Sequence, residues 1–71
     1  MKILRIDAFT AIACAIDKNR INEANQMLKI VSQSISNDKK KKTFSSYIEL
    51  SHKEVNLFKS IMPTIDIYMI E

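Results

Sequence analysis

The stretch from residue 8 to residue 16, AFTAIACAI, constrains the fold of this chain more than any other part of the sequence. Every residue in it except Thr10 is apolar. On a helix, which turns by about 100° per residue, one face of this stretch carries large side chains and the other carries small ones. The large face holds Phe9, Ile12, Ala13 and Ile16, and the small face holds Ala8, Ala11, Cys14 and Ala15. A helix that is apolar all round must be covered on both sides, by this chain or by another.

The composition excludes several classes of fold and function. A chain of 71 residues is long enough for one domain, covering residues 1–71, and a core of this size is marginally stable. Glycine is absent, which disfavours tight hairpins and excludes phosphate-binding glycine loops. The lone cysteine, Cys14, is expected to be a buried free thiol in a reducing, cytoplasmic compartment. No run approaches the roughly 20 apolar residues of a membrane span, so we expect no membrane partner.

The first half of the chain predicts a helical hairpin. Asp7 is a suitable N-cap for a helix over residues 7–18, and Asn19 is expected to take the left-handed position in the following turn. Apolar residues then recur at steps of three and four, at Ile21, Ala24, Leu28, Val31 and Ile35. This spacing predicts an amphipathic helix over 20–36. Because the turn is short, the two helices are expected to pack antiparallel.

The second half predicts a small sheet and a third helix. Alternating apolar and polar residues indicate strands over 43–50 and 64–70, and residues 1–6 are expected to be a short strand or an extended lead-in. Ser51 and Glu54 have the spacing of a capping box at the start of a helix over 52–62. The two later strands pair either in parallel, through a crossover, or antiparallel. The expected fold class is therefore α+β, with the hairpin packed on the sheet.

No constellation of catalytic or metal-binding residues is visible in the sequence. The single histidine, His52, falls in the first turn of the third helix and is expected to be an exposed polar residue. Cys14 has no histidine or second cysteine nearby in the sequence, so it lacks the spacing of a metal site. Glu23 and Glu54 lie near helix starts, where capping and the helix dipole explain them. We therefore expect no enzymatic activity, no cofactor and no metal.

The positive charge is concentrated in one run, Lys39, Lys40, Lys41 and Lys42. Without these four lysines the net charge of +3 becomes −1, with seven basic and eight acidic residues. The run is expected to be a solvated loop that protects a neighbouring strand edge from aggregation. Alternatively, it contacts nucleic-acid phosphates while Phe44 and Tyr47 stack on bases. The rest of the chain lacks the broad basic face that nucleic-acid-binding proteins usually show.

Several apolar and aromatic residues exceed what a small core needs. On the second predicted helix, Ile30 falls outside the apolar stripe and Met27 lies at its margin. On the predicted strands, Tyr47, Tyr68 and Ile70 lie on the faces opposite those that carry most of the apolar residues. Such residues suggest an interface with a partner or with a second copy of the chain. The candidate partner-binding residues are Lys39, Lys40, Lys41, Lys42, Tyr47, Tyr68, Ile30 and Met27.

These features favour a small, non-enzymatic protein-binding module that blocks a larger protein partner. The lysine run would steer it towards an acidic surface on that partner. Compact chains without glycine, a cofactor motif or a catalytic set are similar, as a class, to small inhibitors and regulators of phages and mobile elements, such as anti-CRISPR proteins and antitoxins. The alternative is a small nucleic-acid-binding regulator that uses the same four lysines. A homodimer is compatible with either function.

Overall fold

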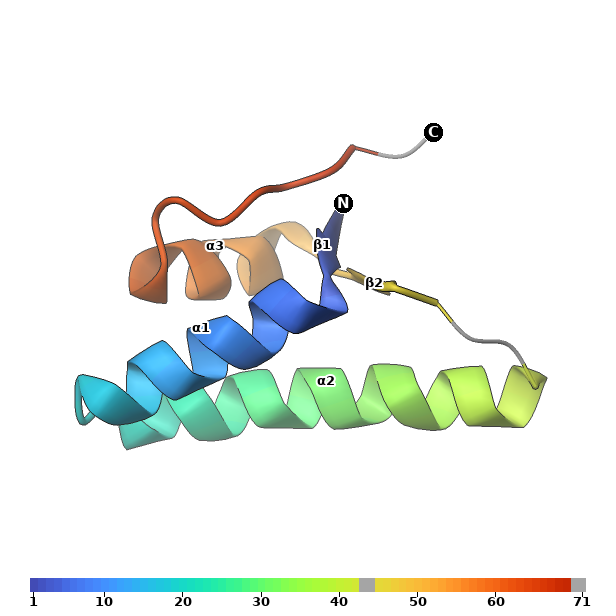
Figure 1. The fold of residues 1–71 in the computed structure, drawn as a ribbon, viewed down its shortest axis with the longest axis horizontal. Coiled ribbons are helices and arrows are strands. Elements are labelled where there is room, and N and C mark those ends of the chain that lie inside the picture. The colour runs from blue at the N-terminus through green and yellow to red at the C-terminus, as the bar shows by residue number, and fades with distance from the viewer. Residues whose placement is uncertain (43–44, 70–71) are drawn as a thin grey trace.

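The computed structural model describes residues 1–42 and 45–69, and it confirms the α+β class (Figure 1). The elements along the chain are β1 (Lys2–Leu4), α1 (Arg5–Asp17), α2 (Ile21–Lys41), β2 (Tyr47–Glu49) and α3 (His52–Ile61). The predicted hairpin is formed by α1 and α2. In Figure 1, α2 runs along the whole length of the molecule, α1 lies against it, and α3 lies above α1.

Helix α1 begins at Arg5, directly after β1 and two residues before the start that we predicted. The backbone N–H of Arg5 donates to the carbonyl of Ser46, at 2.8 Å, so the chain beside β2 supplies an acceptor at the helix start. The residue before the helix, Leu4, provides no side-chain cap. Asp7 was predicted as the cap, but it lies in the first turn, where its negative charge interacts favourably with the helix dipole.

The small-residue face of α1 is the face that this chain buries. The buried residues of the helix are Ala8, Ala11, Ile12 and Ala15. The three alanines let α2, α3 and the two strands pack closely against the helix, and Ile12 of the large face is buried beside them. Large residues on the other side, Ile6, Phe9 and Ile16, are 71%, 47% and 56% exposed. The chain therefore covers one of the two faces that need cover.

The buried face of α2 is rotated away from the stripe that we predicted. Ala24, Met27 and Val31 are buried, whereas Ile21 and Leu28 are 48% and 46% exposed. The reason is that α2 packs against α3 and β2 as well as α1, so its buried face turns towards all three. The predicted stripe and the observed buried residues both recur at steps of three and four, so the spacing alone does not distinguish between them. Met27 was predicted as a partner-binding residue, and this prediction is wrong because its side chain lies wholly in the core.

Helix α2 continues to Lys41 instead of ending near residue 36. Lysine has a high helix propensity, and positive charges in the last turn interact favourably with the negative end of the helix dipole. Asp38, one turn before the end, forms an ion pair with Arg5 of α1 and so holds this extension against the fold. Lys42 ends the helix with a left-handed φ of 54°. The lysine run is therefore the end of a helix and not the loop that we predicted.

The turn between α1 and α2 has the residue in the left-handed position that the sequence predicted. Asn19 adopts a φ of 60°. The N–H of the next residue, Arg20, donates to the carbonyl of Ala15 at 2.8 Å and closes the end of α1. In a chain without glycine, asparagine tolerates this conformation better than most other residues.

The sheet contains β1 and β2, and not the predicted pairing of 43–50 with 64–70. β2 is antiparallel to β1, with Ile3 opposite Ile48. On the other side of β1, the 64–69 segment makes one antiparallel bridge, between Lys2 and Tyr68. Placing β1 in the middle buries both isoleucines completely, which removes much apolar surface from water. Residues 43, 44 and 70 of the predicted strands lie outside the described residues.

Helix α3 begins with the predicted capping box. The N–H of Ser51 donates to Oε1 of Glu54 at 2.8 Å, and the N–H of Glu54 donates to Oγ of Ser51 at 3.3 Å. The helix ends at Ile61, two residues before Pro63. Phe58, in its second turn, is the largest fully buried side chain in the described core.

Candidate binding site beside β2

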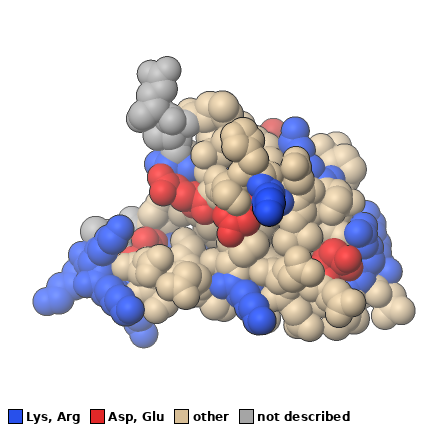
Figure 2. All heavy atoms as spheres, turned by 180° about the vertical axis from the view of Figure 1, so that it is seen from behind, with Lys and Arg blue, Asp and Glu red and all other residues tan. Residues whose placement is uncertain are grey.

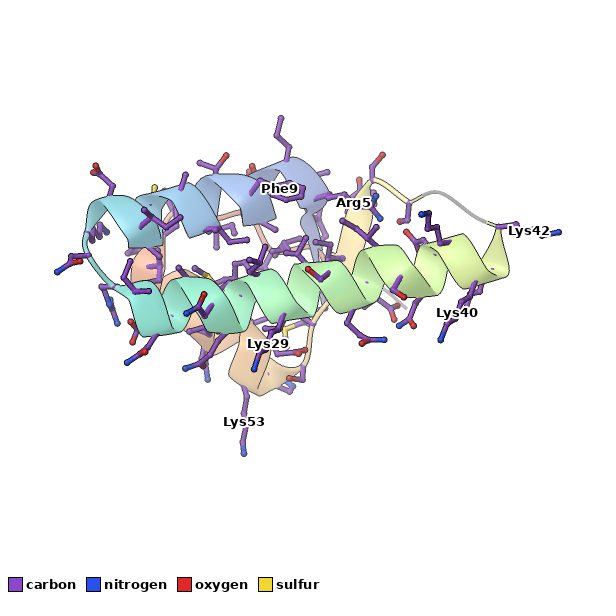
Figure 3. The ribbon with its side chains drawn as sticks, turned by 90° about the horizontal axis from the view of Figure 1, so that it is seen from below. Arg5, Phe9, Lys29, Lys40, Lys42 and Lys53 are labelled. Carbon is purple, nitrogen blue, oxygen red and sulfur yellow. The ribbon has the colours of Figure 1, made fainter. Side chains whose placement is uncertain are left out.

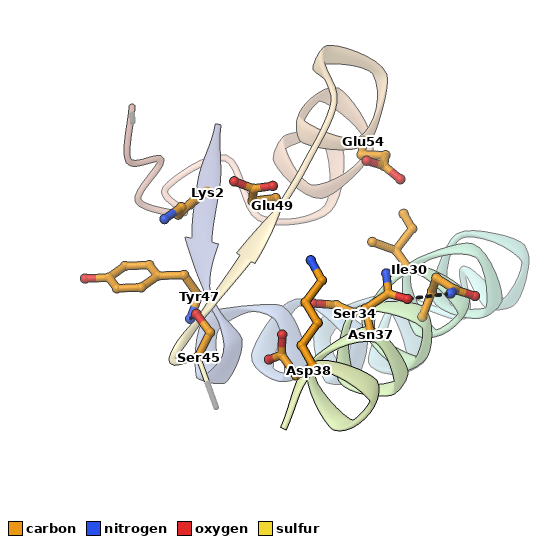
Figure 4. Close-up of a pocket in the computed structure, with 11 residues that line it drawn as sticks. Lys2, Ile30, Ser34, Asn37, Asp38, Ser45, Tyr47, Glu49 and Glu54 are labelled. Carbon is orange, nitrogen blue, oxygen red and sulfur yellow. Dashed lines mark hydrogen bonds between the residues drawn. The ribbon is translucent and has the colours of Figure 1, made fainter. Parts of the chain in front are cut away.

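A groove of about 500 Å³ lies between β2 and the C-terminal half of α2 (Figure 4). Two rows of α2 residues at steps of four form one wall. The first row is Ile30, Ser34 and Asp38, and the second is Gln33, Asn37 and Lys41. The opposite side is lined by Lys2, Ser45, Tyr47 and Glu49, and Glu54 of α3 lies at one end.

The α2 wall is mostly polar, and contacts within the fold position three of its polar side chains. The side-chain amide of Gln33 donates to the side-chain oxygen of Asn37 at 3.2 Å, as the dashed line in Figure 4 shows. Asp38 is paired with Arg5. Ile30 is half-buried and packs against the core at the base of this wall. The wall therefore combines an apolar contact with several hydrogen-bonding groups.

The opposite wall contains a strand edge that the described chain leaves open. In an antiparallel pair, residues alternate between pointing their backbone groups at the partner strand and away from it. Leu50 donates to the carbonyl of Met1, and Ile48 is paired with Ile3, so the backbone groups of Glu49 between them point away from β1. Lys2, which lies opposite Glu49, exchanges its own backbone hydrogen bonds with Tyr68, so within residues 1–42 and 45–69 the pairing with β1 leaves the N–H and C=O of Glu49 unused.

Tyr47 has the same outward orientation at the start of β2. Its N–H donates to the hydroxyl of Ser45 at 3.1 Å. Its C=O accepts no hydrogen bond from the described part of the chain. The backbone groups on the outer edge of β2 thus comprise the C=O of Tyr47 and both groups of Glu49. Figure 4 shows that β2 lies between β1 and the α2 side of the groove.

The aromatic candidates, Tyr47 and Tyr68, lie together beside the groove. Their ring centroids are 5.5 Å apart in an edge-to-face arrangement, and Nζ of Lys2 lies 5.7 Å from the centroid of the Tyr47 ring. Figure 4 shows the Tyr47 ring directed away from α2. Both tyrosines are partly exposed, at 37% and 39%. Tyr47 lines the groove, while Tyr68 packs against the Tyr47 ring from the far side of β1.

The charges of the groove are mixed in sign. Lys2 and Lys41 are basic, and Asp38, Glu49 and Glu54 are acidic. Asp38 is neutralised by its ion pair, and Glu54 takes part in the capping box. A polyanion such as nucleic acid would meet carboxylates in this groove. The groove combines charges of both signs with the open backbone groups of β2, and this combination suits a polypeptide better than nucleic acid.

The groove brings together part of the predicted site. Ile30, Lys41 and Tyr47 line it, and Tyr68 contacts Tyr47. The other three lysines of the run, Lys39, Lys40 and Lys42, are exposed around the end of α2. Figure 2 shows basic side chains gathered at this end of the molecule. Because successive helical residues are about 100° apart, these side chains point around the helix axis and not in one direction.

The sequence prediction missed most of the α2 wall: it ended the helix before Asn37 and Asp38, and it assigned the polar residues of the last predicted turn to no site. Ser34, Asp38, Gln33 and Asn37 line the groove but were assigned to no site. Their spacing of four residues, continued to Lys41, is the signal that would have identified a polar helix face. Lys2 and Glu49 could not be found in this way, because their place depends on the pairing of β1 with β2.

No metal centre accompanies the groove within the described residues. His52 is exposed at the start of α3, and Cys14 is a partly buried free thiol in α1. Across 1–42 and 45–69, no three His, Cys, Asp or Glu side chains are grouped to hold a metal ion. No described helix combines the length and the apolar character needed to cross a membrane.

Comparison with known proteins does not assign this groove to a family. No family model matches the chain, and no curated protein or solved structure is significantly similar to it.

Proposed function

We propose that this protein is a small, non-enzymatic binding module that holds an extended segment of a larger protein in the groove beside β2. The observation that carries the proposal is the outward edge of β2, whose backbone groups at Tyr47 and Glu49 face a groove of about 500 Å³. An extended peptide adds to such an edge by main-chain hydrogen bonds, and neighbouring side chains then select its sequence.

The chemistry of the groove favours this mode of binding. A segment paired with β2 would lie along the groove, where Ile30 offers an apolar contact and Lys41 a positive charge. Tyr47 lines the other side and is packed against Tyr68, and tyrosine is enriched at protein interfaces because it is large and also hydrogen-bonds. The bound segment would then be unavailable to its usual partners, so the module would act by blocking.

The four lysines at the end of α2 support the same role. Lys41 lines the groove, and the charge of the four lysines would raise the rate of association with an acidic partner without specifying the bound sequence. An inhibitor or regulator of the kind that phages and mobile elements encode would work in this way. Charge near an open strand edge also limits aggregation of the free protein.

Selection from a library of short random peptides tests the proposal, because such a library offers the groove many sequences and requires no named partner. The displayed library is enriched on the whole protein, and the enriched peptides are measured by calorimetry. We expect enriched sequences that bind in extended conformation. The absence of any enriched peptide that competes for the groove would contradict the proposal.

Replacing Glu49 separates backbone pairing from side-chain contact. Glu49→Pro removes the outward N–H but no hydrogen bond of the described fold, and proline is tolerated at such edge positions. It is expected to weaken binding of a selected peptide by about tenfold or more. The control Glu49→Ala keeps the N–H and is expected to change affinity less than about threefold. Equal effects of the two changes would show that the backbone of β2 does not bind the peptide.

The alternative function is nucleic-acid binding by the lysines at the end of α2. The favouring observation is the cluster of exposed basic side chains at this end of the molecule (Figure 2). Under this alternative, affinity for duplex or single-stranded DNA falls steeply with salt and is lost when all four lysines are changed to serine. Our proposal predicts that peptide binding survives these changes with a slower association rate, and that DNA binding at moderate salt is negligible.

A further inference from the structure

We infer that the outer face of the α1–α2 hairpin binds a second copy of this chain, in an antiparallel two-fold arrangement. This face is separate from the groove beside β2, so the inference does not depend on the proposed function. It rests on the size, order and charge of the residues that α1 and α2 leave exposed.

The outer face is a continuous apolar surface. On α1, Ile6, Phe9, Ala13 and Ile16 follow each other at steps of three and four and are all exposed. On α2, Ile21 and Leu28 lie seven residues apart and are nearly half exposed. Figure 3 views the hairpin from the α2 side and shows Phe9 in front of α1, on the side turned away from α3. Within the described residues, nothing in this chain covers these side chains further.

The order of side-chain sizes along α1 suits a second α1 running antiparallel. The exposed row reads large, large, small, large: Ile6, Phe9, Ala13, Ile16. In a two-fold pair centred between Phe9 and Ala13, each phenylalanine faces the partner's alanine, and each Ile6 faces an Ile16 of the other copy. A large side chain then enters the space beside a small one, which is how packed helices interdigitate. On α2, Leu28 borders a shallow hollow lined by Asn25 and Ser32, which the other copy's leucine would occupy.

The charge distribution favours the antiparallel orientation over the parallel one. No carboxylate lies in the exposed row between Ile6 and Ile16, and Asp7 lies on another side of the helix. The lysines at the end of α2 lie roughly 20 Å from the middle of the hairpin, at about 1.5 Å per residue. In the antiparallel pair, the two lysine clusters are therefore roughly 40 Å apart, beyond the screening length of about 10 Å at 0.1 M salt. A parallel pair would bring them together.

The extent of this face is sufficient for a stable interface. The molecule measures 35 × 23 × 18 Å, and the hairpin runs along its longest dimension (Figure 3). A standard interface buries about 800 Å² per partner and is built around aromatic and large apolar side chains. Phe9 and Leu28 lie near the middle of this face, where binding energy is usually concentrated.

Sedimentation equilibrium of the full chain at increasing concentration tests this inference. We expect a mass that approaches twice the 8.2 kDa of the chain. Phe9→Glu places a charge in the interface and is expected to raise the dissociation constant by about 100-fold, with an unchanged circular dichroism spectrum. The control Met69→Glu adds the same charge at an apolar residue that is 76% exposed elsewhere, and it is expected to have little effect. A protein that stays monomeric up to millimolar concentration would overturn the inference.

An exchange of sizes tests the register. Phe9→Ala leaves a gap and Ala13→Phe adds bulk, so each change alone is expected to weaken the dimer by about tenfold or more. The double variant restores one phenylalanine facing one alanine in each half of the interface, and is expected to recover most of the lost affinity. If the effects of the two changes simply add, the two residues do not face each other and the register is wrong.

Discussion

Replacing Phe58 by alanine is expected to lower the free energy of unfolding by a large fraction. Phe58 is the largest fully buried side chain of the described core, and removing a buried phenylalanine costs about 3–5 kcal/mol. A domain of 71 residues has a total stability of roughly 4–11 kcal/mol. The substitution therefore removes a large share of the stability, which urea unfolding followed by circular dichroism measures as a lower midpoint.

Phe9→Ala is the matched control, because it removes the same atoms from a phenylalanine that is 47% exposed. It is expected to cost less than about 1.5 kcal/mol at concentrations where the chain is monomeric. If Phe9→Ala destabilised the protein as much as Phe58→Ala, the arrangement of α1 in this structure would be contradicted.

Replacing Met27 by alanine is expected to cost about 2–5 kcal/mol, although the sequence pattern places Met27 at the margin of the core. In the structure Met27 is fully buried, while its neighbour Leu28 is 46% exposed. Leu28→Ala is therefore expected to cost less than about 1.5 kcal/mol. Urea unfolding of the two variants at low protein concentration measures the difference directly.

The pair of substitutions distinguishes two orientations of α2. The stripe predicted from the sequence contains Leu28, whereas the structure buries Met27 and turns Leu28 towards the outer face of the hairpin. A larger loss of stability for Leu28→Ala than for Met27→Ala would show that the helix has the orientation predicted from the sequence. The inferred dimer face would then not exist in its present form.

Local signals in the sequence predicted local structure well. Ser51 and Glu54 form the predicted capping box, and Asn19 takes the left-handed position. The short turn correctly indicated the antiparallel hairpin. In each case, the interacting groups lie within a few residues of each other, so their geometry follows from the backbone of one element.

Features that depend on distant parts of the chain were predicted less well. The end of α2 depends on the ion pair between Arg5 and Asp38, which are 33 residues apart. The sheet depends on β1 pairing with both β2 and Tyr68, which the alternation within each strand does not reveal. The groove needs both features, and for this reason only Ile30, Lys41 and Tyr47 of its lining were among the predicted residues.

The apolar stretch over 8–16 illustrates the same limit. Its composition correctly indicated a helix, and the structure buries the face with Ala8, Ala11 and Ala15, whereas the predicted cover on the other face is not provided by this chain. The orientation could not be derived from α1 alone, because both faces are apolar. Close packing of α2, α3 and the strands favours the small face. The large residues then remain outside, where a second copy would cover them.

Amide hydrogen exchange at Glu49, with and without a selected peptide, tests the proposed binding mode most directly. In the free protein we expect fast exchange at Glu49 and slow exchange at Leu50, whose N–H donates to the carbonyl of Met1 at 2.7 Å. Saturation with the peptide is expected to slow Glu49 by about tenfold or more and to change Leu50 little. Fast exchange at Glu49 in the saturated complex would show that the peptide does not pair with β2, and would contradict the proposed function.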